Sequence, residues 1–368
     1  MLASFSRSSA GWLRRESPST RVKRGSACRR ASRAAPTAAP HAIKLAADLL
    51  RNGKKTLIIL GNAALRAGPV ADATRIAAAT GADVIAAGSN GRVERGRGRH
   101  PLNRIPYPVD QAVAMMAQYA QVILVGTPKP VIFFAYPNKP GSPVPADATL
   151  HILTRPEHDQ AQALAALAGE LGNPKPVAHT DGGEALLGRG AITTEAFAAT
   201  LAALMPEHAI IADESVTFGR AFFPATHHSA PHDWLNVTGG AIGGGIPLAT
   251  GAAIAAPGRR VINLQADGSA MYTIQGLWTQ AREKLDVTTV IFSNRKYQIL
   301  IGELANVGAN PGRTALDMMD LGSPDLDFVK MGEGMGVPGA KATTMEQFND
   351  LFAQSLGRKG PFLIECVI

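Results

Sequence analysis

The sequence predicts an α/β protein with two doubly wound parallel-sheet domains. Short apolar runs alternate with longer segments of helical periodicity, and a Gly- and Pro-rich stretch interrupts this alternation once. The first apolar run, 55–60, ends in Gly61-Asn62. Continuous apolar runs are typical of parallel strands that are buried on both faces, and their alternation with helices is typical of doubly wound sheets. With 368 residues, 46% of them hydrophobic, the chain can bury a sizeable core.

The first domain is predicted over residues 42–172. Helices are expected at 42–51, 70–80 and 109–119, and strands at 55–60, 82–87, 121–125 and 149–153. No G-x-G-x-x-G fingerprint of dinucleotide binding follows the strand at 55–60.

The second domain is predicted over residues 193–368, after a linker at 173–192. Its first helix is expected to begin at Thr193 or Thr194, because either hydroxyl can cap the backbone N–H groups of the first turn. A second helix is expected to begin near Ala270 and to run to about 284. The strands are expected at 208–212, 260–264, 287–292 and 361–367.

The net charge of +8 is concentrated at the N-terminus. Residues 1–41 hold nine basic residues and one acidic residue, and the remainder holds 28 of each. The neutral remainder argues against nucleic-acid binding, which requires a basic face. Residues 1–41 have too little apolar material to offset the entropy of ordering, so we expect a disordered basic extension.

Composition also indicates a compartment. The Arg- and Ser-rich extension resembles an organelle transit peptide, but the Ala, Arg and Gly content of the whole chain favours the upstream extension, or frameshifted translation, of a bacterial gene. The two cysteines, Cys28 and Cys366, do not form a disulfide framework. No apolar run is long enough for a membrane-spanning helix. We therefore expect a cytoplasmic protein, with organelle import as the alternative.

The strongest functional signal is Asp267-Gly268-Ser269, which follows one predicted strand, together with Asn294, which follows the next. Parallel neighbouring strands bring their carboxyl ends to one edge of the sheet, where ligands of such sheets bind. An Asp and an amide provide hard oxygen ligands that suit Mg²⁺, which completes its octahedron with water and phosphate oxygens. Gly268 allows close approach of a diphosphate to the backbone.

Asp-Gly-Ser, 24 intervening residues and Asn closely resemble the cofactor motif of thiamine-diphosphate enzymes of the acetolactate synthase, benzoylformate decarboxylase and pyruvate decarboxylase group. The family usually has Gly where this chain has Ala266, and often has Asn where it has Ser293. The resemblance implies that Asp267 and Asn294 bind Mg²⁺ through their side chains, and Lys296 through its carbonyl.

A second block, from Thr238 to Pro247 (TGGAIGGGIP), also resembles the family. There the equivalent segment lines the aminopyrimidine of the cofactor. By this resemblance the Gly240 carbonyl accepts a hydrogen bond from the exocyclic amine, Ala241 lies between, and Ile242 is the bulky residue that forces the bent cofactor conformation.

Weaker candidates lie nearby. Residues 213–217 (DESVT) resemble the loop that holds the diphosphate, with Ser215 and Thr217 as contacts. No catalytic residue is assigned. We expect His227, His228 and His232 to be loop residues, Glu303 to be a solvated helix residue, and the Arg92–Arg99 cluster to be a solvated loop.

The resemblance covers about residues 42–368 and is strongest to acetolactate synthase-like large subunits, whose central domain is Rossmann-like. It implies FAD in some relatives, although the missing fingerprint leaves FAD unsupported. Full family members begin with a pyrimidine-binding domain whose glutamate protonates the cofactor ring, and 1–41 cannot supply it. We therefore expect a truncated or split component, inactive alone.

Two hypotheses follow. The chain is a catalytic component acting on a small 2-oxo acid, either as a homo-oligomer (dimer or tetramer) or with a separate pyrimidine-domain polypeptide, in the manner of acetolactate synthase or benzoylformate decarboxylase. Alternatively, it is a non-catalytic pseudoenzyme fragment.

Overall fold

The computed structural model describes residues 34–179, 182–183 and 185–368. Residues 1–33 of the basic extension predicted over 1–41 lie outside the described residues, whereas its last residues are ordered, since Ala38 is buried and a helix begins at Pro40. Residues 36–368 form one compact unit. Within the described part, every helix is too short or too polar to cross a lipid bilayer.

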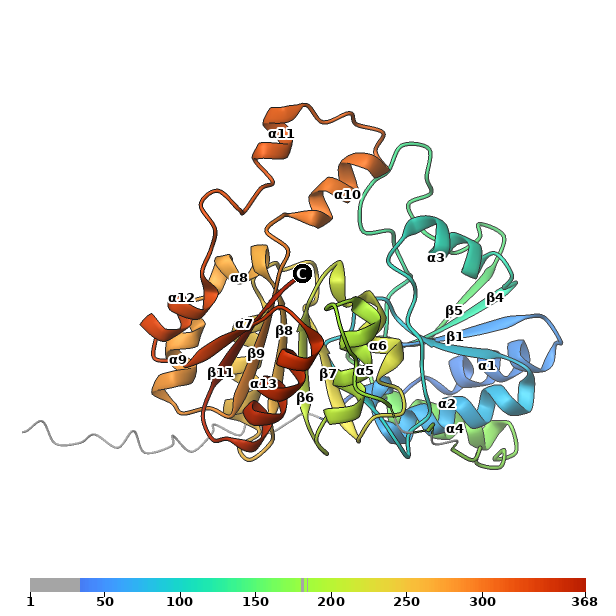
Figure 1. Ribbon diagram of the computed structural model, residues 1–368. Coiled ribbons are helices and arrows are strands. Elements are labelled where there is room, and N and C mark those ends of the chain that lie inside the picture. Colours follow the sequence, from blue (N-terminus) through green and yellow to red (C-terminus); the bar gives the residue numbers. More distant parts are fainter. Residues whose placement is uncertain (1–33, 180–181, 184) are drawn as a thin grey trace, which may run out of the picture. The chain divides into compact units, whose positions relative to one another are not determined.

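The first sheet has four parallel strands in the order β2-β1-β4-β5. They are β1 (Thr56–Leu60), β2 (Asp83–Ala86), β4 (Gln121–Val125) and β5 (Thr149–Thr154). Figure 1 shows three helices on one side of this sheet and α3 on the other. The helices are α1 (Pro40–Arg51), α2 (Ala67–Thr80), α3 (Val109–Met116) and α4 (Gln160–Glu170), with a short 3-10 helix η1 (Asn62–Leu65) after β1.

Alternation along β1 explains why both faces are covered. Ile58 and Leu60 pack into the core that contains α1, α2 and α4, whereas Leu57 and Ile59 pack into the core beneath α3. Successive side chains of a strand point to opposite faces, so a fully apolar run needs helices on both sides. The predicted doubly wound arrangement is confirmed.

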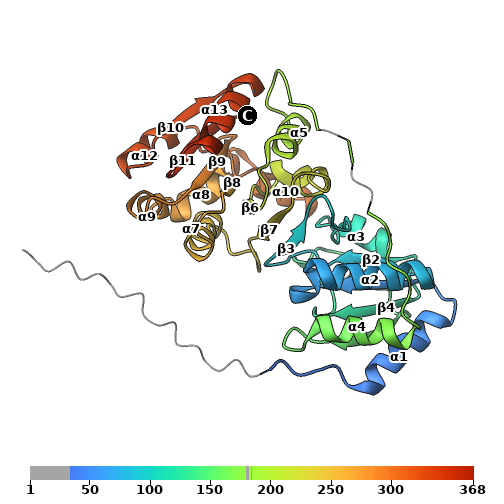
Figure 2. The ribbon, with the colours of Figure 1, turned by 90° about the horizontal axis from the view of Figure 1, so that it is seen from below.

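The second sheet has seven strands in the order β10-β11-β9-β8-β6-β7-β3, and the labels in Figure 2 follow this order. All neighbouring pairs are parallel except β3 with β7. The strands are β3 (Val93–Arg95), β6 (Ile210–Glu214), β7 (His232–Asn236), β8 (Val261–Ala266), β9 (Val287–Ser293), β10 (Gly339–Ala342) and β11 (Phe362–Val367).

The helices of this part follow the strands in α/β order. They are α5 (Thr194–Leu204), η2 (Phe218–Ala221), α6 (Phe222–Ala225), α7 (Gly245–Ala255), α8 (Asp267–Thr273), α9 (Gly276–Arg282), α10 (Gln298–Asn306), α11 (Arg313–Asp317), α12 (Phe328–Gly334) and α13 (Met345–Gly357). The Thr193 hydroxyl accepts a hydrogen bond from the Ala196 N–H, 3.2 Å away, so the predicted cap of α5 is confirmed.

The predicted helix from Ala270 to about 284 is wrong in two respects. It begins earlier, at Asp267, and it is divided into α8 and α9. The short strands β3, β7 and β10 were not predicted, because none of them is a continuous apolar run.

The Arg92–Arg99 cluster was predicted to be a solvated loop. This prediction is wrong, because the cluster contains β3. Arg95 is buried, and its guanidinium lies 3.5 Å from the centre of the Phe223 ring and 5.4 Å from that of Trp234. The aromatic faces and the Phe223 carbonyl compensate the buried charge. His232 is likewise not a loop residue but the buried first residue of β7.

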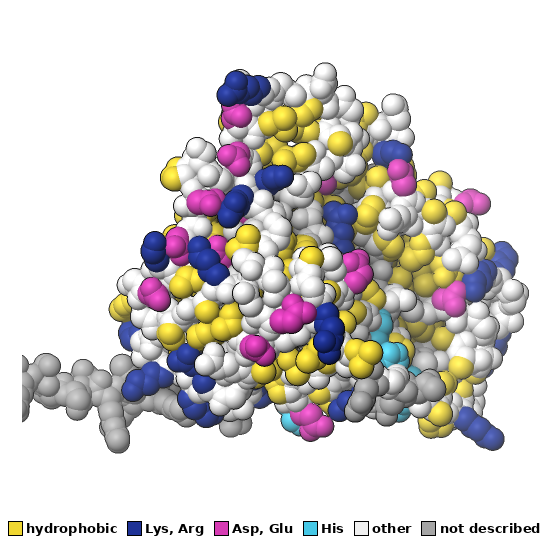
Figure 3. Space-filling view, viewed as in Figure 1, with side chains coloured by type: hydrophobic (Ala, Val, Ile, Leu, Met, Phe, Trp, Pro, Cys, Tyr) yellow, Lys and Arg dark blue, Asp and Glu magenta, His cyan; other side chains and the backbone are white. Residues whose placement is uncertain are grey.

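Charged side chains of both signs are interspersed over the face shown in Figure 3. This distribution agrees with the balance of acidic and basic residues after residue 41. The only cysteine that the structure describes, Cys366, is free and buried, and burial raises the pKa of its thiol.

Candidate functional site

The predicted site residues gather where β6, β8 and β9 end. These three strands are neighbours in the sheet and run parallel, in the order β9-β8-β6. Glu214 is the last residue of β6, Asp267 directly follows β8, and Asn294 directly follows β9. The topology therefore brings together residues that are far apart in the sequence.

Asp267 is buried, with 2% of its surface exposed. Its Oδ1 accepts a hydrogen bond from the Gly268 N–H at 2.8 Å, and its Oδ2 accepts one from the Arg295 N–H at 2.7 Å. Burial raises the pKa of the carboxyl, and the influences that oppose this rise are backbone N–H groups rather than a cationic side chain. A buried carboxylate without a cationic partner is costly to the fold.

Asn294 is half-buried, and its Oδ1 accepts a hydrogen bond from the Lys296 N–H at 2.9 Å. Lys296 forms an isolated antiparallel bridge with Asp320. The hydrogen bonds of this bridge come from its flanking residues, from Tyr297 N–H to Met319 and from Leu321 N–H to Arg295. Both backbone polar groups of Lys296 are therefore directed away from the 319–321 segment.

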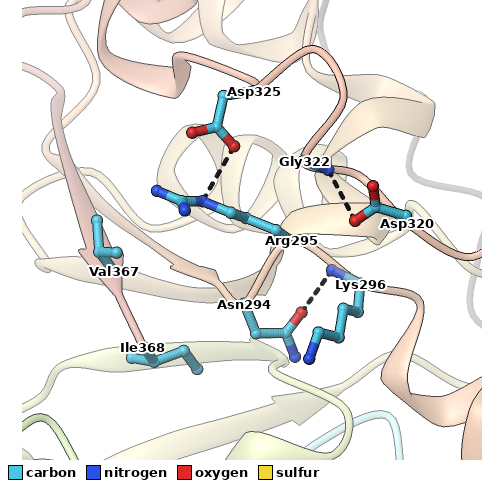
Figure 4. Close-up of a pocket in the computed structure, with 8 residues that line it drawn as sticks. All are labelled: Asn294, Arg295, Lys296, Asp320, Gly322, Asp325, Val367 and Ile368. Atoms are coloured by element: carbon cyan, nitrogen blue, oxygen red, sulfur yellow. Dashed lines mark hydrogen bonds and ion pairs between the residues drawn. The ribbon is translucent and has the colours of Figure 1, made fainter.

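A cavity of about 420 Å³ lies beside these two residues. Figure 4 shows Asn294 and Lys296 on one side of it and the acidic side chains of Asp320 and Asp325 on the other. Asp325 forms an ion pair of 3.0 Å with Arg295.

Gly268 and Ser269 form the first turn of α8 and are buried. A Cβ atom on Gly268 would lie 2.5 Å from the ring of Tyr297, so this glycine is needed for packing in the structure as it stands. Burial and the nearby Tyr272 and Asp267 raise the pKa of Tyr297. Sequence reasoning missed Tyr297, because the position of its ring depends on the course of the loop after β9.

The Gly-rich segment forms an exposed loop between β7 and α7. Gly240 has φ of +65° and its carbonyl accepts a hydrogen bond from the Ile242 N–H at 2.8 Å. Ala241 and Ile242 are exposed, Ile242 to 47%. The Phe133 ring lies directly against Gly240 where a side chain would otherwise begin.

Glu214 is buried, and its carboxylate holds this loop. Its Oε1 accepts a hydrogen bond from the Gly243 N–H at 2.6 Å. Its Oε2 accepts bonds from the Gly245 N–H and from Nε2 of Gln265, both at 2.8 Å. Nothing in the sequence distinguished this carboxylate from its neighbour Asp213.

Ser215 and Thr217 differ in their surroundings. Ser215 is buried, and its hydroxyl donates to Oδ1 of Asp213 at 2.5 Å. Thr217 is half-buried. Between them, Val216 has φ of +51°, a conformation that a β-branched residue rarely adopts. Such outliers occur often at functional loops.

Glu303 was predicted to be a solvated helix residue, but its carboxylate is hydrogen-bonded to two tyrosines. Its Oε2 accepts a hydrogen bond from the Tyr136 hydroxyl at 2.7 Å, and its Oε1 lies 3.4 Å from the Tyr107 hydroxyl. Burial and the Glu303 carboxylate raise the pKa of Tyr136. These bonds connect α10 with the segment between β4 and β5, through Tyr136, and with the segment before α3, through Tyr107.

The donor set fits Mg²⁺ bound together with a diphosphate. Among the residues that the structure describes, no three His, Cys, Asp or Glu side chains are grouped closely enough to hold a metal by themselves. Asp267 and Asn294 offer one carboxylate and one amide oxygen. An ion there needs further oxygens from outside the protein, which is the usual mode of Mg²⁺ with phosphates.

Known proteins match this chain in sequence and in fold. Residues 218–366 match the model "Thiamine pyrophosphate enzyme, C-terminal TPP binding domain". IlvX of Mycobacterium tuberculosis, named as an acetolactate synthase large subunit, is 45% identical over 335 residues, which are 90% of this chain and 64% of that protein. Benzoylformate decarboxylase of Pseudomonas aeruginosa is 29% identical over 66% of this chain and 48% of its own length.

A solved structure agrees with these relatives. The thiamine diphosphate-dependent 4-hydroxybenzoylformate decarboxylase of Rhodococcus jostii superposes with a TM-score of 0.71 at 28% identity, covering 90% of this chain and 65% of that one. The chain thus spans just under two thirds of the length of IlvX and of this decarboxylase. Over about 90% of its length the chain is thus similar to thiamine-diphosphate-dependent enzymes of the acetolactate synthase and benzoylformate decarboxylase type, and residues 218–366 match the C-terminal TPP-binding domain of thiamine pyrophosphate enzymes.

Proposed function

We propose that this chain is the Mg²⁺- and diphosphate-binding component of an acetolactate synthase-like enzyme that acts on 2-oxo acids. The observation that carries the proposal is the buried Asp267 carboxylate, which has no cationic side chain beside it. A divalent cation at this position would compensate that charge. Bound thiamine diphosphate would supply an electron sink for cleavage of the bond next to the 2-oxo group.

Asp267 and Asn294 would bind the cation through side-chain oxygens, and Lys296 through its carbonyl. The backbone arrangement supports the Lys296 assignment. The N–H of Lys296 is directed to Asn294, and the bridge to Asp320 leaves both backbone polar groups of Lys296 turned away from the 319–321 segment.

Gly268, Ser269 and Thr217 would contact the diphosphate. Ser215 remains in the proposed set, but its hydroxyl and its N–H both donate to Oδ1 of Asp213, so one of these bonds would have to break before Ser215 could donate to a phosphate oxygen. Thr217 is therefore the better donor of the two. The Tyr297 ring would have to move for a phosphate to reach Gly268 closely.

Gly240, Ala241 and Ile242 would form the surface for the aminopyrimidine. The exposed Ile242 side chain can press against a ligand, and Gly240 can present its carbonyl. The pyrimidine ring also needs an acid to protonate its nitrogen. We propose that this acid comes from a pyrimidine-binding domain on another polypeptide, with which the chain assembles in the cytoplasm.

A benzoylformate decarboxylase-like activity is the second candidate. Aromatic rings lie beside the loop proposed for the aminopyrimidine: Phe133 contacts Gly240, and the ring centres of Phe133 and Tyr107 are 6.2 Å apart. Such a surface favours an aryl rather than a methyl substituent on the 2-oxo acid.

Calorimetric titration with Mg²⁺, thiamine diphosphate and both together tests the proposal. We expect strong binding only for the combination, because the cation bridges Asp267, Asn294 and the phosphates. Asp267→Ala should lower the affinity at least about 100-fold, equivalent to about 2.7 kcal/mol. Asp325→Ala is the matched control, since Asp325 lies near Asn294 but bonds to Arg295. Equal binding by the Asp267 variant and the parent protein would exclude this metal site.

A further inference from the structure

We propose that Glu214 is a positioning residue that fixes the Gly-rich loop in the shape required by the aminopyrimidine half of the cofactor. The inference rests on the proposed function and extends it to a residue that contacts neither metal nor phosphate. Glu214 belongs to β6, whereas the loop it holds lies 24 or more residues later in the chain.

The geometry of the carboxylate supports a positioning role. Both oxygens of the buried Glu214 side chain accept hydrogen bonds, Oε1 from Gly243 at 2.6 Å and Oε2 from Gly245 and Gln265 at 2.8 Å. An ionised carboxylate is an acceptor only, and three N–H donors match it. A group so occupied is poorly placed to donate a proton to a ligand.

The loop is held from the opposite side as well. The Thr273 hydroxyl, on α8, donates to the Gly243 carbonyl at 2.6 Å. Gly243 itself has φ of +88° and lies against Tyr272, where a Cβ atom would come within 2.5 Å of the Tyr272 Cβ. Gly243, the residue that follows Ile242, is thus hydrogen-bonded at both its N–H and its carbonyl.

Close packing behind the loop makes the arrangement specific. A Cβ atom on Gly245 would lie 2.9 Å from the Glu214 Cβ and would also clash with Oε1 of Gln265. Within the described residues, this Gln265 oxygen is buried without a hydrogen-bond partner. Gln265 therefore serves to orient Glu214 through its Nε2 alone, and the loop can adopt this position only with glycine there.

Loss of the Glu214 carboxylate should affect only the aminopyrimidine half of thiamine diphosphate. Residues 240–242 would face the aminopyrimidine, whereas Asp267, Asn294 and Thr217 would face the metal and the phosphates. Loss of the Glu214 carboxylate should therefore weaken binding of thiamine diphosphate but not that of inorganic diphosphate, each measured with Mg²⁺.

The test compares these two probes by calorimetry in the parent protein, Glu214→Gln and Glu365→Gln. Glu365 is the control because it is also a buried glutamate in this sheet, on β11, away from the loop. In Glu214→Gln we expect an approximately tenfold weaker affinity for thiamine diphosphate, the effect of about one charge-assisted hydrogen bond. The affinity for inorganic diphosphate should stay within about twofold.

Equal losses for both probes, or no loss for either, would overturn the positioning role. If Glu214→Gln does not fold, Gln265→Leu and Thr273→Val each remove one bond of the same network and should shift the ratio of the two affinities in the same direction. An unchanged ratio in both of these variants would also reject it. Absence of binding by the parent protein would instead reject the proposed function itself.

Discussion

The two parallel sheets end their strands in different ways. At the carboxyl ends of β1 and β4, backbone groups bond to the neighbouring strands. The Gly61 N–H donates to the Val125 carbonyl, and the Gly126 N–H donates to the carbonyl and the hydroxyl of Thr154. At the corresponding ends of β6, β8 and β9 lie Glu214, Asp267 and Asn294. The fold class is the same, but only the seven-stranded sheet buries carboxylates at this edge.

The comparison shows that the energetically unfavourable buried carboxylates lie at the edge of only one of the two sheets. A Cβ atom on Gly61 would lie 2.8 Å from the Cβ of Thr127, so the edge of the four-stranded sheet has little room for a ligand near β1. The edge of the seven-stranded sheet instead retains the unpaired Asp267, which a purely structural sheet would not need.

The largest effect is expected in a test of whether the edge of the seven-stranded sheet, with Glu214, Asp267 and Asn294, is sufficient for catalysis. The 368-residue polypeptide alone should show no measurable turnover of pyruvate or benzoylformate, because in the proposed function the acid for the pyrimidine ring comes from another polypeptide. Loss of general acid–base assistance alone is worth about 10²- to 10⁴-fold. Product formation should appear on addition of a pyrimidine-domain polypeptide with its glutamate, but not with Gln in its place. Robust turnover by the chain alone would show that a group within it has this role.

The next prediction separates the stability of the first sheet from the chemistry of the second. Ile59→Ala should lower the free energy of unfolding by about 2–5 kcal/mol, because the fully buried side chain leaves a cavity beneath α3. Denaturant titration measures this loss. The affinity for Mg²⁺ with inorganic diphosphate should be unchanged at a temperature where the variant is folded. A parallel loss of affinity would mean that the two sheets are energetically coupled.

The smallest effect is expected for the pH dependence of stability, compared between one histidine from each sheet. Burial, reinforced by the charge of Arg95, lowers the pKa of His232 to about 3. His232 is therefore neutral in the folded protein, while the unfolded chain takes up a proton below its ordinary pKa of about 6.5. Stability should fall as the pH decreases from about 6.5 toward 3, by up to about 1.4 kcal/mol per pH unit.

His232→Asn should remove part of this acid sensitivity, because the Asn amide can replace Nδ1 as donor to the Ala230 carbonyl, 2.7 Å away. His151, on β5 of the other sheet, is the control. Burial lowers the pKa of His151, but its bond to the Ala42 carbonyl opposes that shift. Urea titrations at several pH values give the comparison. If His151→Asn had the larger effect, the assignment to His232 would be wrong.

Much of the fold could be predicted from the sequence, because the central strands are continuous apolar runs, which indicate parallel strands buried on both faces. The short strands β3 and β7 could not, since Arg95 and His232 normally indicate solvent exposure. The burial of Arg95 depends on contacts with Phe223 and Trp234, which are far from it in the sequence. Likewise the domain boundaries at 42–172 and 193–368, and the linker at 173–192, stay predictions.

For the site, the spacing of Asp267 and Asn294 was informative because neighbouring parallel strands leave few alternatives for where their ends lie. Their roles as ligands remain proposals. The role of Glu214 was not predictable, because the direction of its side chain depends on where the Gly-rich loop passes. Tyr297 was missed for the same reason, as its ring position follows from the loop after β9.

The antiparallel pairing of β3 with β7 has a consequence for dividing the protein. β3 comes from the first half of the chain and covers the outer edge of β7, with Val93 opposite Trp234. Arg92 also forms an ion pair of 2.8 Å with Asp233. A fragment that began after residue 172 would expose an unpaired strand edge, which invites pairing with other chains and aggregation. A minimal cofactor-binding fragment should therefore carry its own substitute for residues 92–95.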